Sequence, residues 1–63
     1  MYDFKKINQN EMIHLWKDNK IIATLKNGYY TINKYGVLTL YNYEKIFICE
    51  FACYSYDKME IID

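Results

Sequence analysis

The dipeptide Asn27-Gly28 constrains this chain more than any other feature, because it lies between two runs rich in β-branched and aromatic residues. A type I′ turn needs positive φ at both central residues, and Asn followed by Gly tolerates that backbone best. Further along, residues 34–36, Lys-Tyr-Gly, suit a three-residue loop with glycine in the left-handed position. The stretch 21–40 therefore predicts three short antiparallel strands joined by two tight turns.

The two turns also predict a register, and with it two faces of a sheet. A turn at 27–28 would pair Leu25 with Tyr30, and the second loop would then pair Tyr30 with Leu40 and Ile32 with Leu38. The predicted core face holds Ile21, Ala23, Leu25, Tyr30, Ile32, Leu38 and Leu40. The reverse face holds Ile22, Thr24, Lys26, Tyr29, Thr31, Val37, Thr39 and Tyr41.

The same pattern extends toward the N-terminus. Asp18-Asn19 suits a second two-residue turn, which would set Trp16 opposite Ile21. Alternation from that pair then predicts three further side chains on the core face, namely Met12, His14 and Trp16.

The pattern also extends toward the C-terminus. A four-residue loop at 42–45 would pair Tyr41 with Ile46 and Leu40 with Phe47. This register predicts four more side chains on the core face: Phe47, Cys49, Phe51 and Cys53. Glu50 would point away from the core, as a charged residue should.

The ends of the chain are less regular. Residues 1–10 favour a short N-terminal strand or arm followed by a turn, and 59–62 favour a closing strand. The competing interpretation is a helix near 8–17, because Asn8 and Glu11 have capping-box spacing and apolar residues follow them. That helix would pack on the sheet and make the fold α+β.

The chain of 63 residues is expected to form one small domain, residues 1–63. A domain of this size buries only about 60% of the surface of its unfolded chain and is marginally stable. We predict an all-β fold, a small single-domain antiparallel β-meander of five to six strands, as a twisted sheet or small barrel.

The two cysteines indicate a reducing compartment. Cys49 and Cys53 would lie about 13 Å apart on an extended strand, which is beyond disulfide reach. We expect reduced, buried thiols in a cytoplasmic protein, with no apolar run long enough for a membrane span. The absence of arginine and proline, with many Ile, Lys, Asn and Tyr residues, is typical of an AT-rich genome such as that of a low-GC bacterium or its phage.

Catalytic groups are scarce, so we expect no enzyme, no metal and no cofactor. The chain has one histidine, His14, and one serine, Ser55, whose spacing does not suggest a triad. Cysteines four apart on a strand do not form a zinc knuckle, and the scattered carboxylates form no pair for acid–base chemistry.

Binding functions remain. A small β-barrel that binds single-stranded nucleic acid through surface tyrosines is one hypothesis, since aromatic side chains stack on bases. The formal net charge of +0 disfavours it, because phosphate neutralisation supplies most of the affinity in such complexes.

We therefore favour a non-enzymatic protein-interaction module, with a phage or mobile-element inhibitor that occludes a surface of a larger host protein as its most specific form. The reverse face is too apolar to leave exposed to water on a monomer. Either the sheet curls into a barrel and its own termini cover part of that face, or two copies bury it mutually, and we predict the homodimer. The predicted interaction or dimer face comprises Ile13, Leu15, Ile22, Tyr29, Val37, Tyr41, Ile46 and Ile48. Predicted partner contacts are Tyr35, Tyr43, Tyr54 and Tyr56.

Overall fold

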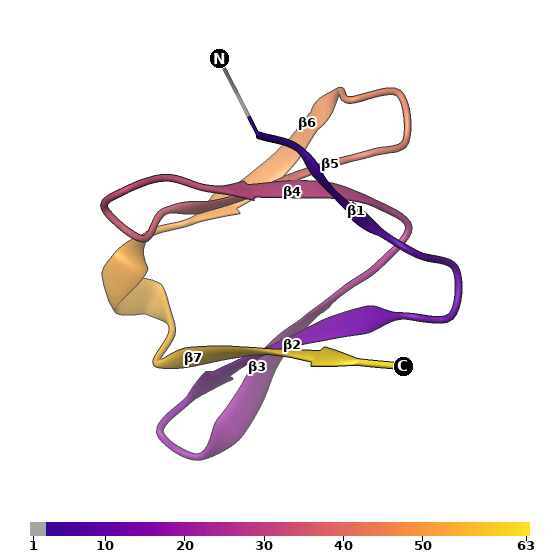
Figure 1. Ribbon diagram of the computed structural model, residues 1–63. Helices are drawn as coiled ribbons and strands as arrows, with labels where there is room; N and C mark the ends of the chain where they lie inside the picture. The colour runs from indigo at the N-terminus through magenta and orange to yellow at the C-terminus, as the bar shows by residue number, and fades with distance from the viewer. Residues whose placement is uncertain (1–2) are drawn as a thin grey trace.

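The computed structural model describes residues 3–63, which form seven strands and one short 3-10 helix (Figure 1). The strands are β1 (Lys5–Ile7), β2 (Met12–Lys17), β3 (Lys20–Leu25), β4 (Gly28–Ile32), β5 (Leu38–Tyr41), β6 (Phe47–Phe51) and β7 (Lys58–Ile62), with the helix η1 at Cys53–Ser55. They make two antiparallel sheets, ordered β1-β4-β5-β6 and β3-β2-β7. The predicted all-β class is confirmed, with the strands divided between two sheets.

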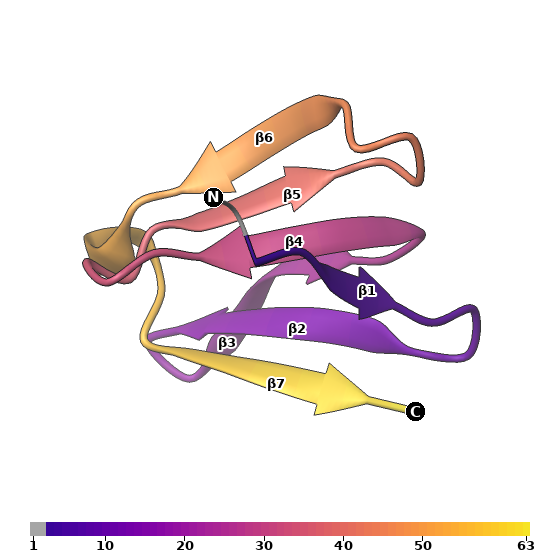
Figure 2. The ribbon, with the colours of Figure 1, turned by 45° about the horizontal axis from the view of Figure 1, so that its top comes forward.

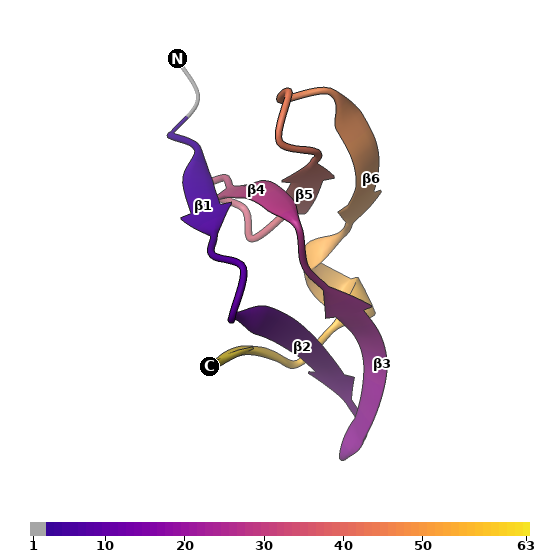
Figure 3. The same cartoon turned by 90° about the vertical axis from the view of Figure 1, so that its right-hand side faces the viewer.

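The predicted hairpin at Asn27-Gly28 is wrong. β3 pairs with β2, whereas β4 pairs with β1 and β5, so the dipeptide is a corner between the sheets (Figure 3). Asn27 does adopt the positive φ that the turn chemistry indicated, at 63°. Strands that bend from one sheet into the next are a common way to turn the corner of a two-sheet fold.

Gly28 is buried where β4 runs between β1 and β5. It is not among the residues with positive φ. A Cβ on Gly28 would instead collide with the backbone oxygen of Tyr41. The close approach of two backbones, rather than the turn geometry, is therefore what requires glycine here.

The predicted turn at Asp18-Asn19 is confirmed, with φ values of 53° and 65°. Trp16 lies opposite Ile21 as expected, but a bulge at the step from Trp16 to Leu15 then shifts the register, so that Leu15 faces Ala23. A shift of one residue exchanges the two faces of a strand.

The core side of β2 is consequently formed by Ile13 and Leu15, both buried. The prediction that Met12, His14 and Trp16 form this part of the core is wrong, since all three are only partly buried. The placement of Ile13 and Leu15 on an exposed interaction face is wrong for the same reason.

The β4–β5 hairpin follows its predicted register, with Tyr30 opposite Leu40 and Ile32 opposite Leu38. The side-chain Oδ1 of Asn33 accepts hydrogen bonds from two backbone N–H groups of the loop, at 2.8 and 3.0 Å. Gly36 takes the left-handed position, with φ of 82°. Local chemistry thus determines this turn completely.

The β5–β6 loop repeats the same design. Asn42 Oδ1 accepts two backbone N–H bonds at 2.8 and 3.0 Å, and Lys45, at φ 64°, takes the left-handed position. Because the Asn42 N–H donates to the Ile46 carbonyl, Tyr41 lies opposite Phe47 and not opposite Ile46 as predicted. A register shift follows, and Leu40 faces Cys49 instead of Phe47.

A short N-terminal strand is present as β1 within the predicted range 1–10, of which residues 1–2 lie outside the described part of the chain. The alternative helix at 8–17 is wrong because β2 occupies most of that range. Glu11 Oε1 does accept the Asn8 N–H at 3.0 Å, which is one of the two bonds of a capping box. The Glu11 N–H donates at 2.9 Å to the Asn8 carbonyl oxygen instead of its side chain. These bonds close the turn between β1 and β2, so the spacing identified a real contact but not a helix.

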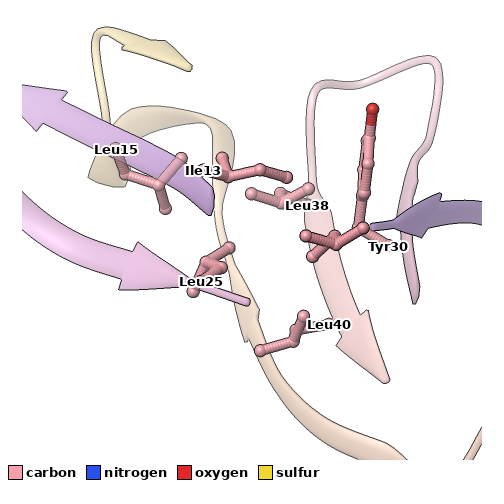
Figure 4. Close-up of a cluster of buried hydrophobic side chains, with 7 residues drawn as sticks. Ile13, Leu15, Leu25, Tyr30, Leu38 and Leu40 are labelled. Carbon is pink, nitrogen blue, oxygen red and sulfur yellow. The ribbon is translucent and has the colours of Figure 1, made fainter. Parts of the chain in front are cut away.

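The core lies between the two sheets (Figure 4). Its buried side chains are Ile7, Ile13, Leu15, Leu25, Tyr30, Leu38 and Leu40. Cys49 and Phe51 pack against this cluster, whereas Ile21, Ile32, Phe47 and Cys53, also predicted for the core face, are exposed. Both cysteines are free thiols, and burial raises the pKa of Cys49.

The closing strand β7 pairs with β2 and is attached to the β2–β3 turn by Asp57. Asp57 Oδ2 accepts the Asp18 N–H at 2.9 Å, and Lys17 Nζ lies 3.4 Å from Oδ1. The hydrogen bond from Asp18, aided by the charge of Lys17, lowers the pKa of Asp57. The carboxylate therefore connects segments about 40 residues apart.

We expect Asp57→Asn to reduce stability at neutral pH and to flatten its decline in acid. A carboxyl whose pKa is lowered by folding stabilises the protein fully above its unfolded pKa, and that contribution is lost as the pH falls through the lower folded value. Thermal melts from pH 7 to pH 2.5 should therefore converge at the acid end for the native chain and the Asp57→Asn variant. Asp63→Asn is the control, and a difference that stays constant with pH would contradict the role assigned to Asp57.

Candidate binding surface on β6

Exposed apolar side chains gather on β6 and the residue before it. Ile46 and Phe47 are each 57% exposed and Ile48 is 50% exposed. β6 lies at the edge of the four-stranded sheet and pairs with β5 alone among the described strands (Figure 2). The chain thus presents an apolar run beside an open row of backbone hydrogen-bonding groups.

A groove of about 540 Å³ lies on the outer face of the same sheet. The face is identified by alternation, because Thr31, Thr39 and Tyr41 are neighbours of core residues along β4 and β5. The groove is lined by Asp3, Lys5, Thr31, Ile32, Asn33, Val37, Thr39, Tyr41, Phe47 and Glu50. It therefore adjoins the apolar run of β6 through Phe47.

The charges that line the groove do not cancel. Lys5 Nζ lies 3.6 Å from Asp3 Oδ2, so these two residues form an ion pair. Glu50, opposite Thr39 on the neighbouring strand, has no ion-pair partner among residues 3–63. The described lining of the groove thus carries one uncompensated negative charge.

An aromatic cluster of Phe4, Tyr29, Tyr41 and Tyr43 lies on the same sheet. The rings of Phe4 and Tyr41 meet edge to face with centroids 4.8 Å apart, and Tyr29 is 6.1 Å from both Phe4 and Tyr43. Lys45 Nζ lies 5.2 Å from the centroids of Phe4 and Tyr29. Within this cluster the Tyr41 ring packs against Phe4 and also lines the groove.

The predicted dimer face is divided by the fold. Val37 and Tyr41 line the groove, Ile46 and Ile48 lie at β6, and Tyr29 belongs to the aromatic cluster. Ile22 is exposed on β3, in the other sheet, and Ile13 and Leu15 are core residues. The other five residues of the predicted face, Tyr29, Val37, Tyr41, Ile46 and Ile48, therefore all lie on the four-stranded sheet or its loops.

The four tyrosines predicted as partner contacts differ in role. Tyr35 and Tyr54 are exposed, with 68% and 80% of their surface accessible. Tyr43 donates its hydroxyl to the Ile7 carbonyl at 2.9 Å and remains partly exposed. Tyr56 packs against the core and donates to the Gly36 carbonyl at 2.7 Å, so it supports the fold.

His14 lies in the other sheet, opposite Thr24 and Glu60. Its Nδ1 is buried and has no hydrogen-bond partner in the described part of the chain. Beside it, Trp16 Nε1 donates to Glu60 Oε1 at 3.1 Å, and Lys58 lies over the Trp16 ring at 5.0 Å. Within residues 3–63, no group of three or more His, Cys, Asp or Glu side chains is placed to hold a metal ion.

Sequence reasoning did not assign most of the groove lining to a site, including Phe47, Glu50 and the two threonines Thr31 and Thr39. Phe47 was assigned to the core because the register shift in β6 has no signature in a strand pattern. Glu50 was expected to point outward, and it does line the outer face, but nothing in its neighbours along the chain indicated a groove. The isolation of one charge in an apolar strand was the available signal.

Comparison with protein-family models, curated proteins and solved structures finds no match to this chain. Over the described range, no helix has the length and apolar character needed to cross a membrane. Function is therefore inferred from the groove, the β6 edge and the aromatic cluster.

Proposed function

We propose that this chain is a non-enzymatic protein-interaction module that binds an extended segment of a larger protein along β6. The supporting observation is the run Ile46-Phe47-Ile48, at least half exposed at every position beside an open strand edge. Addition of a strand to an exposed edge is a recurring mode of peptide recognition, in which the backbone gives affinity and side-chain pockets give specificity. The neighbouring groove supplies such a pocket.

The geometry of β6 suggests how the segment would be held. The register shift leaves Cys49, Glu50 and Phe51 regularly paired with β5, so this half of β6 is the part suited to main-chain pairing. The bulged half, with Phe47 and Ile48, would contribute apolar side-chain contacts instead. Inhibition by covering a surface of the partner is the form of this function that we propose for so small a chain.

A second copy of the chain is the competing occupant. The homodimer stays a prediction, now centred on the β6 region, since Ile48 and Ile46 are exposed there. We favour a different protein because a homodimer would pair two β6 edges that are each interrupted by the register shift. A strand from a different protein would bring no second interruption of this kind. Sedimentation of the purified chain would distinguish the two occupants.

Single-stranded nucleic acid is the second candidate, favoured by one observation. Lys45 and Lys6 lie beside the rings of the aromatic cluster, and cations next to aromatic platforms are typical of such sites. The rings, however, pack edge to face against one another, and the whole chain has formal net charge +0. Both facts leave protein as the better-supported partner.

We expect Ile48→Lys to weaken binding of the protein partner at least tenfold, because it places a charge where apolar surface must be desolvated. Ile22→Lys is the matched control, since Ile22 is 46% exposed but lies in the other sheet. The native chain would be used to isolate a partner from host lysate. The purified partner would then be titrated calorimetrically against the native chain, the Ile48→Lys variant and the Ile22→Lys variant.

The proposal predicts loss of affinity for the β6 variant alone, and protection of the backbone amides of residues 49–51 from hydrogen exchange in the complex. Equal effects of the two lysine substitutions would refute it. The proposal would also be refuted if the retained partner were a nucleic acid. Such a partner would be nuclease-sensitive, and its affinity would fall about 10³-fold or more between 50 and 200 mM salt, as expected when several phosphates are neutralised. Capture of the chain itself and nothing else would assign the surface to a homodimer instead.

A further inference from the structure

We infer that the groove beside β6 receives a cationic side chain, lysine or arginine, from the segment that binds there. This inference rests on the proposed function and names the chemistry of its partner. Three features of the groove support it, each judged over residues 3–63: an uncompensated carboxylate, two aromatic rings without a cation of their own, and two threonines in the same row across the sheet as the carboxylate.

The carboxylate is that of Glu50. Lys5, the one lysine in the described lining of the groove, lies 3.6 Å from Asp3, so its charge is already matched. None of the lysines in the described range forms an ion pair with Glu50. A cation brought by a partner would therefore find a free counter-charge, and the approach would be attractive at a distance.

The rings are those of Tyr41 and Phe47, which lie opposite each other on β5 and β6. Both line the groove, and Phe47 is largely exposed. Within residues 3–63, four lysines lie over aromatic rings, but none lies over either of these two. A cation positioned over an aromatic face is attracted by the ring quadrupole, so these rings are able to accept one.

The hydroxyls come from Thr31 and Thr39, which pair across β4 and β5. Thr31 is a buried polar residue, and Thr39 lies directly opposite Glu50 on the next strand. Hydroxyl oxygens accept hydrogen bonds from ammonium or guanidinium groups, which carry several donors each. The volume of about 540 Å³ is ample for one long basic side chain.

The arrangement also disfavours the other ligand classes. A carboxylate or phosphate would meet the charge of Glu50 with no unpaired lysine in the described lining to offset it. A purely apolar side chain would bury that carboxylate without a partner, which is costly. The expected binding segment is therefore one in which a basic residue lies near apolar residues that contact Phe47 and Ile48.

Nuclear magnetic resonance titration would test this with three small probes: Nα-acetyl-lysine methylamide, Nα-acetyl-arginine methylamide and the neutral Nα-acetyl-norleucine methylamide. We expect the two cationic probes to shift the amide signals of Thr31, Thr39 and Glu50, and to bind at least fivefold more tightly than norleucine. Glu50→Gln should remove at least fivefold of the affinity for the cationic probes. Glu44→Gln, in the exposed β5–β6 loop, should change it by less than twofold.

Phe47→Leu is the second informative variant, because it keeps an apolar side chain but removes the ring. It should weaken binding of the cationic probes about threefold, because the cation loses its attraction to the ring quadrupole. Circular dichroism would verify that each variant folds.

Equal binding of norleucine and lysine probes, or no effect of Glu50→Gln, would overturn the inference about the cation. The proposed function would still stand if Ile48→Lys abolished binding of the protein partner. Loss of discrimination between Ile48→Lys and Ile22→Lys would instead refute the proposed function itself.

Discussion

Replacing Gly28 with alanine should destabilise the protein by about 3 kcal/mol, a large part of what a domain of this size possesses. The added Cβ would collide with the backbone oxygen of Tyr41, and backbone on both sides is fixed by pairing with β1 and β5. Neither β4 nor β5 can move away from the other without losing hydrogen bonds in the middle of the sheet. Urea unfolding followed by circular dichroism would measure the change.

Asn27→Gly is the control for this prediction. Asn27 has φ of 63°, which glycine adopts without strain, so we expect a change within about 0.5 kcal/mol. If turn conformation alone mattered at 27–28, Gly28→Ala would cause little loss of stability, because Gly28 does not have positive φ. Asn27→Ala would then cause the larger loss, because Asn27 does. That outcome would mean that β4 and β5 do not approach as closely as the structure shows.

Local turn chemistry was readable from the sequence because it depends on neighbouring residues. Asn33 with Gly36, and Asp18 with Asn19, each determine a turn within a few positions, and both turns form where predicted. The partner of each strand is a different matter, since it is decided by distant segments. β3 has β2 as its neighbour, so a tight bend at 27–28 became a corner between sheets.

The bulges account for most of the errors in the core. Alternation predicted that Met12, His14 and Trp16 face inward, and the register shift at the Leu15–Trp16 step reversed that assignment. The residue types on the two faces of β2 indicated which face is the core face. Ile and Leu are more often fully buried than Met, His or Trp, so the aliphatic face of β2 was the better candidate for the core.

The candidate site was predictable only in part. Exposure of Ile48 and the outward direction of Glu50 follow from strand alternation near the end of the sheet. The groove depends on how four strands twist past one another, which no single segment specifies. The cation preference likewise depends on two facts of the folded chain: Lys5 lies beside Asp3, and no described lysine pairs with Glu50.

Leu15→Ala should have an effect comparable with that of Gly28→Ala, and it decides between the predicted and observed registers of β2. Leu15 is fully buried between the sheets, and truncation of such a leucine costs about 2–5 kcal/mol through lost burial and the cavity that remains. Ile22→Ala is the matched control, because Ile22 was predicted for the same face but is exposed on β3, so its truncation should cost about 0.5 kcal/mol or less. Thermal and urea unfolding of both variants would measure the difference. If the two variants lost similar stability, the bulge would be absent in solution and both side chains would lie on one common face. If Leu15→Ala alone unfolds the protein, the bulge is what aligns β2 with the core.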